Sequence, residues 1–487
     1  MRPSVGESVA SNATLLIISR VLSRLVGLAV ILLITRLLGA EGFGRFSFAF
    51  SFVGLIAVIM GAGLTPLVTR EMARRKEEAG EYLGSAAVIK VGLLGVAILA
   101  LVGITESVVT EPASRTAMYL AAVSLFAVSF TGMINGAFRA FEQTQYEVLG
   151  FVAGKLVLLS LCILCYVRAV GLTVVVGCFA GTSLLELGVA VYLLRARLIP
   201  TGFRVTARTA RMLLVNALPF ALSSVLGVIY FRIDVVMLRF IKGDLATGWY
   251  GGAYRFVEAV LFVPDLMAAA LFPVLARKFF AGDSLSGIFG RSFRLFFTLA
   301  LPFALGATFF PRVTRLLGSE FGGSEEVLPY LGWTLFLLFM NYLFVTTLNS
   351  AERQRQVTVA LGCGALANIL LNLLFVPRWG HVGAGVATLI STALVFAVEW
   401  AAVRQCVEGS GIRRAMIGRP LVAGCVLGVM WFFLRGENIL WVVPAGGAVY
   451  VLALVLLKGL PSEDWRLLKG ALQGARTQAV KGDKARG

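Results

Sequence analysis

Long apolar stretches recur along the whole chain, separated by short polar breaks. Each is about 20 residues, enough for a helix to cross a hydrocarbon layer of ~30 Å. The pattern predicts fourteen such helices, at 13–38, 45–68, 84–105, 117–138, 147–167, 171–194, 212–238, 247–275, 292–311, 327–350, 357–376, 383–403, 418–434 and 439–458. The first follows a near-neutral start and runs past the length of a signal-peptide core, so we expect it to be retained. The expected fold class is therefore an all-α integral membrane protein.

The second half of this pattern repeats the first. Five pairs of residues recur at offsets of 204, 206, 207, 214 and 213: Asn12 and Asn216, Gly42 and Gly248, Pro66 and Pro273, Asn135 and Asn349, and Glu186 and Glu399. Because six helices is an even number, the two copies should insert with the same orientation, as in transporters with parallel repeats. The repeat predicts an N-terminal lobe at 1–200, a C-terminal lobe at 201–410, two further helices at 411–460 and a basic cytoplasmic tail at 461–487.

Composition and charge agree with a polytopic membrane protein. Of 487 residues, 58% are hydrophobic and 14% are charged, and the mean hydropathy is +0.87. The net charge of +18 would suit nucleic acid, yet 28 of the 44 Lys and Arg residues lie at the N-terminus, in loops after even-numbered spans and in the tail. This is the distribution of the positive-inside rule. It predicts cytoplasmic termini and basic residues that contact membrane lipids, with no nucleic acid partner.

Some cations remain inside the predicted spans, namely Arg20, Arg24, Lys90, Lys155, Arg232 and Arg255. A charge near the bilayer centre costs at least ~2.5–3.5 kcal/mol on insertion scales, so these side chains should face protein or water. A cavity lined by arginine suits a diphosphate, whose oxygens match the guanidinium fork. The candidate substrate-binding residues are Arg20, Arg24, Arg232 and Arg255. For Arg20 and Arg24, four residues apart on one helix face, the alternative is that they reach the cytoplasmic headgroups.

The stretch "YFRIDVVMLRF" contains both Arg232 and Asp234. Residues two apart cannot share a helix face, so each needs its own neighbour. Asp234 could pair with Arg255 or Arg20 in one state of the protein and release it in another. The alternative is a static ion pair that orients two helices.

Glu258 and Asp265 join Asp234 as candidates for gating or ion coupling. Asp265 follows Pro264, where a helix break would leave carbonyl groups able to help bind a coupling cation. A plain proline kink is the alternative. We expect no cofactor, with Na⁺ or H⁺ as the candidate coupling ion.

The cysteines and the histidine do not indicate catalysis or a metal site. Cys162 and Cys165 form a C-x-x-C in an apolar span without basic neighbours, which favours packing. His381 is the only histidine, so it has no second histidine with which to hold a metal.

Several stretches resemble the polysaccharide flippases of the Wzx type, within the multidrug/oligosaccharidyl-lipid/polysaccharide (MOP) exporter superfamily. They are "LLGAEGFGRFSFAF", "GLTPLVTREMAR", "YFRIDVVMLRFIKGDLATGWYGGAYRFVEAV", "LFPVLAR" and "NILLNLLFVPRWGHVGAGVAT". The likeness covers residues 10–410, and the fourteen-helix layout is also similar to that of the lipid II flippases, of the MurJ type.

The resemblance implies that the chain moves a polyprenyl-diphosphate-linked oligosaccharide from the cytoplasmic to the outer leaflet by alternating access, for assembly of a cell-surface polysaccharide. In lipid II flippases an arginine pair on the first helix, and an arginine on the eighth with a glutamate three residues later, mark the central cavity. Arg20 and Arg24, with Arg255 and Glu258, match that pattern, whereas the second-helix arginine has no clear match after Arg45. The resemblance also implies a monomeric, non-enzymatic transporter of the cytoplasmic membrane.

Two other functions remain open. A multidrug or cation exporter of the same superfamily would need an acidic cavity and would typically stop at twelve helices. A membrane glycan polymerase or glycosyltransferase would place catalytic carboxylates or histidines on a sizeable outer loop, which the pattern does not predict.

Overall fold

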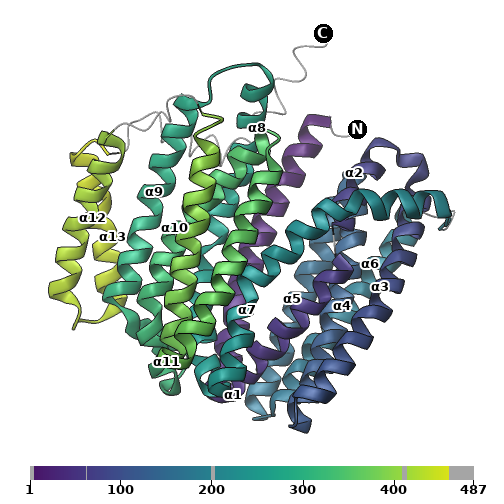
Figure 1. Ribbon diagram of the computed structural model, residues 1–487, viewed down its shortest axis with the longest axis horizontal. Coiled ribbons are helices and arrows are strands. Elements are labelled where there is room, and N and C mark those ends of the chain that lie inside the picture. Colours follow the sequence, from purple (N-terminus) through teal and green to yellow (C-terminus); the bar gives the residue numbers. More distant parts are fainter. Residues whose placement is uncertain (1–4, 62, 199–202, 408–413, 460–487) are drawn as a thin grey trace. The chain divides into compact units, whose positions relative to one another are not determined.

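The structure is a computed structural model that describes residues 5–61, 63–198, 203–407 and 414–459; the side chains of residues up to 24, and of Pro219, Ala415 and Leu440, lie outside the description. Within these ranges every regular element is helical (Figure 1). In order they are α1 (Val5–Gly61), α2 (Leu64–Arg74), η1 (Lys76–Glu78), α3 (Ala79–Val108), α4 (Pro112–Ala140), α5 (Thr144–Val167), α6 (Leu172–Arg197), α7 (Ala207–Val260), α8 (Phe262–Phe280), α9 (Ser286–Phe309), η2 (Pro311–Leu317), η3 (Ser319–Gly323), α10 (Ser324–Ser350), α11 (Gln354–Val403), α12 (Arg414–Leu434) and α13 (Ile439–Leu456).

Ten of the described helical segments are long and apolar enough to cross a membrane, and the shorter Trp441–Leu456 is also apolar. Three of the ten, Leu25–Arg74, Phe220–Phe280 and Gln354–Val403, contain 50, 61 and 50 residues. A straight helix of 50 residues would be about 75 Å long, more than twice the thickness of a hydrocarbon core of ~30 Å. None of the three can therefore be a single straight crossing.

A glycine interrupts each of these long segments. Gly39 (φ 66°, ψ −176°), Gly243 (φ 83°, ψ −173°) and Gly380 (φ 57°, ψ −131°) have positive φ angles inside α1, α7 and α11. The conformation of Gly39 and Gly243 is one that essentially only glycine adopts, because a Cβ atom would clash with the backbone. All three fall in gaps between predicted spans, so each long helix turns where the hydropathy pattern ends one span and begins the next.

The chain forms two compact units, Met1–Arg239 and Phe240–Gly474, and α7 contributes residues to both. In the first unit α4 packs against α6, and α1 packs against α3, α4 and α5. In the second unit α10 packs against α8, α9 and α11, while α12 packs against α9 and α13 (Figure 1).

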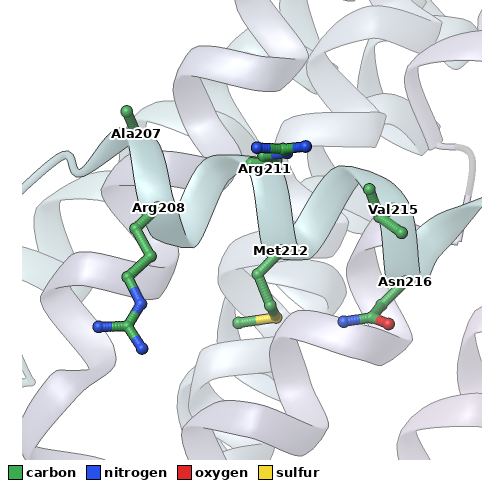
Figure 2. Close-up of a pocket in the computed structure, with 6 residues that line it drawn as sticks. All are labelled: Ala207, Arg208, Arg211, Met212, Val215 and Asn216. Carbon is green, nitrogen blue, oxygen red and sulfur yellow. The ribbon is translucent and has the colours of Figure 1, made fainter.

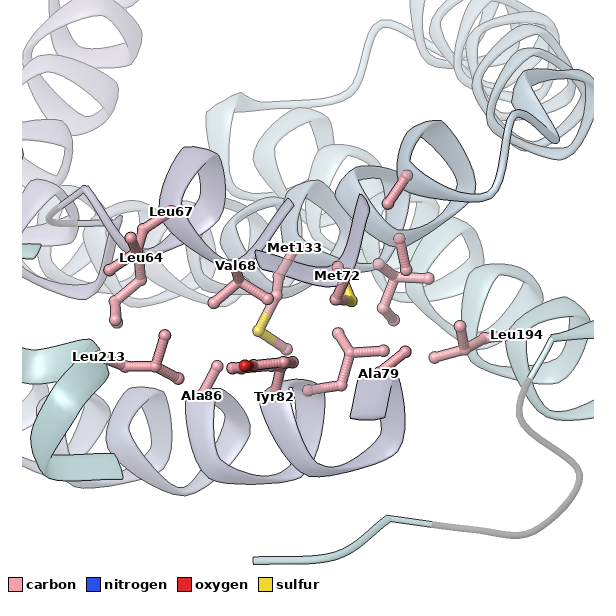
Figure 3. Close-up of a cluster of buried hydrophobic side chains, with 14 of the residues drawn as sticks. Leu64, Leu67, Val68, Met72, Ala79, Tyr82, Ala86, Met133, Leu194 and Leu213 are labelled. Carbon is pink, nitrogen blue, oxygen red and sulfur yellow. The ribbon is translucent and has the colours of Figure 1, made fainter. Parts of the chain in front are cut away.

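A buried apolar cluster joins α2, α3 and the beginning of α7 within the first unit (Figure 3). Val68 of α2, Ala86 of α3 and Leu213 of α7 are each fully buried there. Close backbone approach makes the contact with α7 possible, since a Cβ at Gly63 would lie 2.3 Å from that of Phe220. The first turns of α7 are thus fixed to the first unit through one face.

Two turns, one in each unit, share the same geometry and support the repeat. Between α4 and α5, the Gln143 N–H donates to the Phe138 carbonyl at 2.8 Å; between α10 and α11, the Arg353 N–H donates to the Leu348 carbonyl at 2.8 Å. Glu142 and Glu352, the residues before the two donors, both have positive φ, 61° and 57°.

Buried hydroxyl side chains give a second register for the repeat. Thr182 and Ser183 of α6 are buried, as are Ser391 and Thr392 of α11, which lie 209 residues further on. At that spacing Glu399 corresponds to Ala190, and Glu186 to Val395. This register differs by four residues, one helical turn, from the predicted pairing of Glu186 with Glu399, and a shift by one turn keeps side chains on the same helix face.

Candidate functional site

Arg255 and Glu258 form an ion pair on α7 in the second unit. Nη1 of Arg255 lies 2.5 Å from Oε2 of Glu258, and the two side chains are 22% and 23% exposed. Their spacing of three residues places them on the same helix face. A guanidinium has five N–H donors, so an arginine held by one carboxylate can still bind phosphate oxygens.

Asp234 and Arg232 belong to the first unit and differ in burial. Asp234 is 1% exposed and its Oδ1 accepts a hydrogen bond from the Val235 N–H at 2.8 Å, whereas Arg232 is only partly buried. The different environments agree with side chains on different helix faces. Arg20 and Arg24 lie on α1, but their side chains are outside the described ones.

The second unit contains a proline kink near Pro264, the alternative to a helix break. Leu261, between α7 and α8, keeps helical angles (φ −60°, ψ −15°), and the Asp265 N–H donates to the Leu261 carbonyl at 3.3 Å. Helix α7 ends at Val260 and α8 begins at Phe262. Proline has no N–H, so Pro264 cannot donate to the Val260 carbonyl and the helical hydrogen-bond ladder is interrupted. Asp265, partly buried, follows in the first turn of α8, where a carboxylate is favoured by the helix dipole.

Lys90, another cation of the predicted spans, has local partners. It is fully buried, and its Nζ donates to the carbonyl and the hydroxyl of Ser129 at 2.7 and 2.8 Å. The same Nζ lies 5.6 Å from the centre of the Phe130 ring. These contacts connect α3 to α4, so we interpret Lys90 as a structural residue.

The second unit also contains a cluster of buried polar side chains that were not among the predicted site residues. Asn368, Asn372 and Ser391 are each 0% exposed. The Asn368 amide donates to the Ser391 hydroxyl at 3.2 Å, and the Asn372 amide donates to Oδ1 of Asn368 at 2.8 Å. Two asparagines four apart in the apolar stretch "NILLNLL" were the available signal. The cluster supplies uncharged oxygen atoms of the kind that bind a hard cation.

Hydrogen bonds fix the chain before α7 to the beginning of α3. Oε1 of Glu81 accepts hydrogen bonds from the hydroxyls of Thr206 and Thr209, both at 2.5 Å, and the Arg204 N–H donates to the Gly80 carbonyl at 3.2 Å. Together with the apolar cluster of Figure 3, this joint holds α7 against α3.

We expect Gly84→Ala to weaken this joint. A Cβ at Gly84 would lie 2.3 Å from the carbonyl oxygen of Arg204, a backbone atom that cannot rotate away. Overpacking of this kind destabilises by roughly 1–3 kcal/mol. The melting temperature of the purified protein should fall. Gly92→Ala on the same helix is the control, because nothing lies within 4 Å of its Cβ position; equal melting temperatures would contradict the close approach.

A wide, open pocket lies against the opposite face of α7. A cavity of about 650 Å³ is lined by Ala207, Arg208, Arg211, Met212, Val215 and Asn216. In Figure 2 the Arg208, Met212 and Asn216 side chains extend below the helix axis, and those of Ala207, Arg211 and Val215 lie above it. The cavity therefore combines two guanidinium groups and an amide with apolar side chains.

Comparison with known proteins identifies the family. The profile of the family described as "Polysaccharide biosynthesis protein" matches residues 9–279, more than half of the chain. The chain belongs to this polysaccharide biosynthesis protein family. A second profile, MatE, matches residues 219–374. Both matches agree with the resemblance to polysaccharide flippases of the MOP superfamily, which is confirmed.

Relatives of this family member carry flippase names. The "Probable low-salt glycan biosynthesis flippase Agl15" of Haloferax volcanii is 22% identical over 380 residues, covering 74% of this chain and 76% of the relative. The "Probable flippase AglR" of the same organism is 24% identical over 447 residues, covering 88% and 90%.

Solved structures share the fold of this family member. "Lipid II flippase MurJ, inward closed conformation" is similar with a TM-score of 0.75 at 12% identity, covering 92% of this chain and 98% of that one. An inward-facing multidrug resistance MATE family transporter of the MOP superfamily is similar with a TM-score of 0.65 at 17% identity, covering 79% and 94%. The protein is thus a multi-pass membrane protein with a MurJ- and MATE-like fold.

Proposed function

We propose that this protein is a flippase that moves a polyprenyl-diphosphate-linked oligosaccharide across the cytoplasmic membrane for cell-surface polysaccharide assembly. The family match over residues 9–279 carries the proposal. The half-buried Arg255–Glu258 pair supports it, because a guanidinium within a membrane segment suits the substrate's diphosphate. Arg20, Arg24 and Arg232 are the other proposed phosphate contacts.

The proposed topology has fourteen membrane passes. The ten long helices, the shorter Trp441–Leu456 and the three glycine breaks account for that number. Passes one to six (1–200) and seven to twelve (201–410) form two lobes of a parallel repeat, followed by two further passes at 411–460 and a cytoplasmic tail at 461–487. Both termini are then cytoplasmic, and a single chain suffices for alternating access between the lobes.

The coupling ion is proposed to be Na⁺ or H⁺. Asp234, buried in the first unit, and Asp265, beside the proline kink at Pro264, are the acidic candidates. Glu258 is the third acidic candidate. If its carboxylate bound the ion and released Arg255, the guanidinium would be free to bind the substrate's diphosphate. The protein is proposed to act as a transporter and not as an enzyme.

A multidrug exporter is the second candidate, favoured by the MatE match at residues 219–374. Such an exporter takes organic cations and needs acidic groups in its cavity. The exposed arginines of the α7 cavity favour an anionic substrate instead.

Reconstitution distinguishes the two functions. The full-length protein is placed in liposomes that contain a fluorescent polyprenyl-diphosphate-linked sugar, and the fraction of label accessible to an impermeant quencher is followed over time. We expect faster exchange between leaflets than in protein-free liposomes. If the protein exchanges no such lipid but extrudes an organic cation dye, the exporter replaces the flippase.

A further inference from the structure

We propose that the α7 cavity is a docking site for the diphosphate headgroup of a prenyl lipid, which it receives from the cytoplasmic leaflet before transport. The inference rests on the proposed function and adds to it a first contact outside the transmembrane arginines. Three features of one face of α7 support it: the face is exposed, it bears two arginines, and apolar side chains follow the arginines along the helix.

The face of α7 that bears Arg208 and Arg211 points away from the joint with α2 and α3. Leu213 and Ala217 are buried in the cluster of Figure 3, so one side of α7 is fixed to α2 and α3. At 100° per residue, the side chains at 208, 211 and 215 point the other way. They are exposed in the structure. The same helix is therefore anchored on one face and open to a ligand on the other.

Charge defines the ligand that this face can accept. Arg208 and Arg211 are three residues apart, so their side chains begin about 5–6 Å from each other. Arg211 forms no hydrogen bond or ion pair with a described residue, and Arg208 interacts with the charge of Glu81 without a direct ion pair. Two guanidinium forks at this spacing can each bind one phosphate of a diphosphate, and the Asn216 amide adds a further donor.

The apolar surface beside the arginines argues for a lipid instead of a soluble phosphate. Met212 and Val215 line the cavity between the arginines and the next turn. Leu218 and Leu222 continue along α7 and are 62% and 56% exposed. A ligand with an anionic head and a hydrocarbon chain matches this order of side chains.

Binding to the full-length protein in nanodiscs of neutral lipid tests the site. The probe is geranylgeranyl diphosphate, and the variant is Arg208→Gln with Arg211→Gln. Loss of a charge-assisted hydrogen bond weakens binding about tenfold, so we expect roughly a hundredfold weaker binding in the double variant. Arg74→Gln with Arg75→Gln removes the same charge from exposed positions of the same unit and should change binding less than about twofold. Equal binding by the wild type and the Arg208/Arg211 variant would overturn the site.

Competition experiments identify the part of the ligand that is recognised. Inorganic pyrophosphate should compete weakly, since it lacks the hydrocarbon chain, and phosphatidylglycerol should compete weakly, since it carries one phosphodiester. If pyrophosphate competes as well as the prenyl diphosphate, the apolar part of the proposal is wrong. If phosphatidylglycerol competes as well as the prenyl diphosphate, this face of α7 is an ordinary contact with anionic lipid and the proposed docking site is wrong.

The transport assay separates this inference from the proposed function. Arginine-dependent binding by a protein that exchanges no lipid-linked sugar would support the docking site and contradict the flippase. Exchange with an unchanged KM in the Arg208/Arg211 variant would support the flippase and contradict the docking site. Arg208→Lys with Arg211→Lys, which retains the charge, should give an intermediate KM.

Discussion

Arg255→Ala should abolish exchange of the lipid-linked sugar while the protein still reaches the membrane. The substitution removes a guanidinium from a half-buried position and leaves the Glu258 carboxylate without its partner at 2.5 Å. Loss of this partner is unfavourable for the partly buried Glu258 carboxylate, and substrate binding loses the proposed phosphate contact as well. Arg255→Lys should recover only part of the activity, because an ammonium group lacks the bidentate fork. Activity is measured as leaflet exchange in liposomes, and membrane insertion by the amount of protein in the membrane fraction.

A second arginine–glutamate pair in the same unit provides the control. Arg315 lies 2.5 Å from Glu325, but its side chain is 61% exposed. An exposed pair contributes about 0–1 kcal/mol, so Arg315→Ala should leave exchange unchanged. We expect Arg24→Ala to behave like Arg255→Ala. Full exchange by both Arg24→Ala and Arg255→Ala would mean that these cations have structural roles only.

Gly243→Ala should lower the melting temperature of the protein markedly. No atom lies within 4 Å of the Cβ position of Gly243, so the added methyl group meets no neighbouring residue. The loss comes from the backbone conformation at φ 83°, which costs an alanine roughly 1–3 kcal/mol. Thermal unfolding of the purified protein measures the change.

Gly227→Ala is the matched substitution in the same helix. Nothing lies within 4 Å of its Cβ position either, and its φ is not positive. Alanine is favoured over glycine in a helix interior by roughly 1 kcal/mol, so this variant should be as stable as the wild type or more so. A Gly243→Ala protein that melts at the same temperature as Gly227→Ala would show that the turn in α7 does not depend on glycine.

Hydropathy predicted the helical class and the gaps at Gly39, Gly243 and Gly380 because a bilayer imposes a minimum length on each apolar span. Arg255 and Glu258 were named together only through the resemblance to lipid II flippases, and their ion pair was not predicted. Residues four apart share a face, however, so periodicity alone does not fix whether Glu399 pairs with Glu186 or with Ala190.

The hydropathy pattern could not predict the joint between α3 and α7, for a different reason. Glu81 and Thr206 are separated by 125 residues, and Arg204–Thr209 reads as an ordinary basic loop. Asn368 and Asn372 were not predicted as site residues because they carry no charge, and the candidates within the apolar spans were chosen by charge. One sequence contains no signal that joins such distant or uncharged positions.

Helices that are joined by a single glycine should enter the bilayer as pairs during synthesis. The turn at Gly39 leaves no long polar segment that could stay behind while the next helix is made. In the proposed topology the charges near this turn cross the membrane, and Arg45 is partly neutralised within α1 because it lies 2.8 Å from Glu41. Because neutral groups cross hydrocarbon at a lower free-energy cost than ions, the insertion machinery would handle α1 as one hairpin, whose two arms become stable in the membrane together.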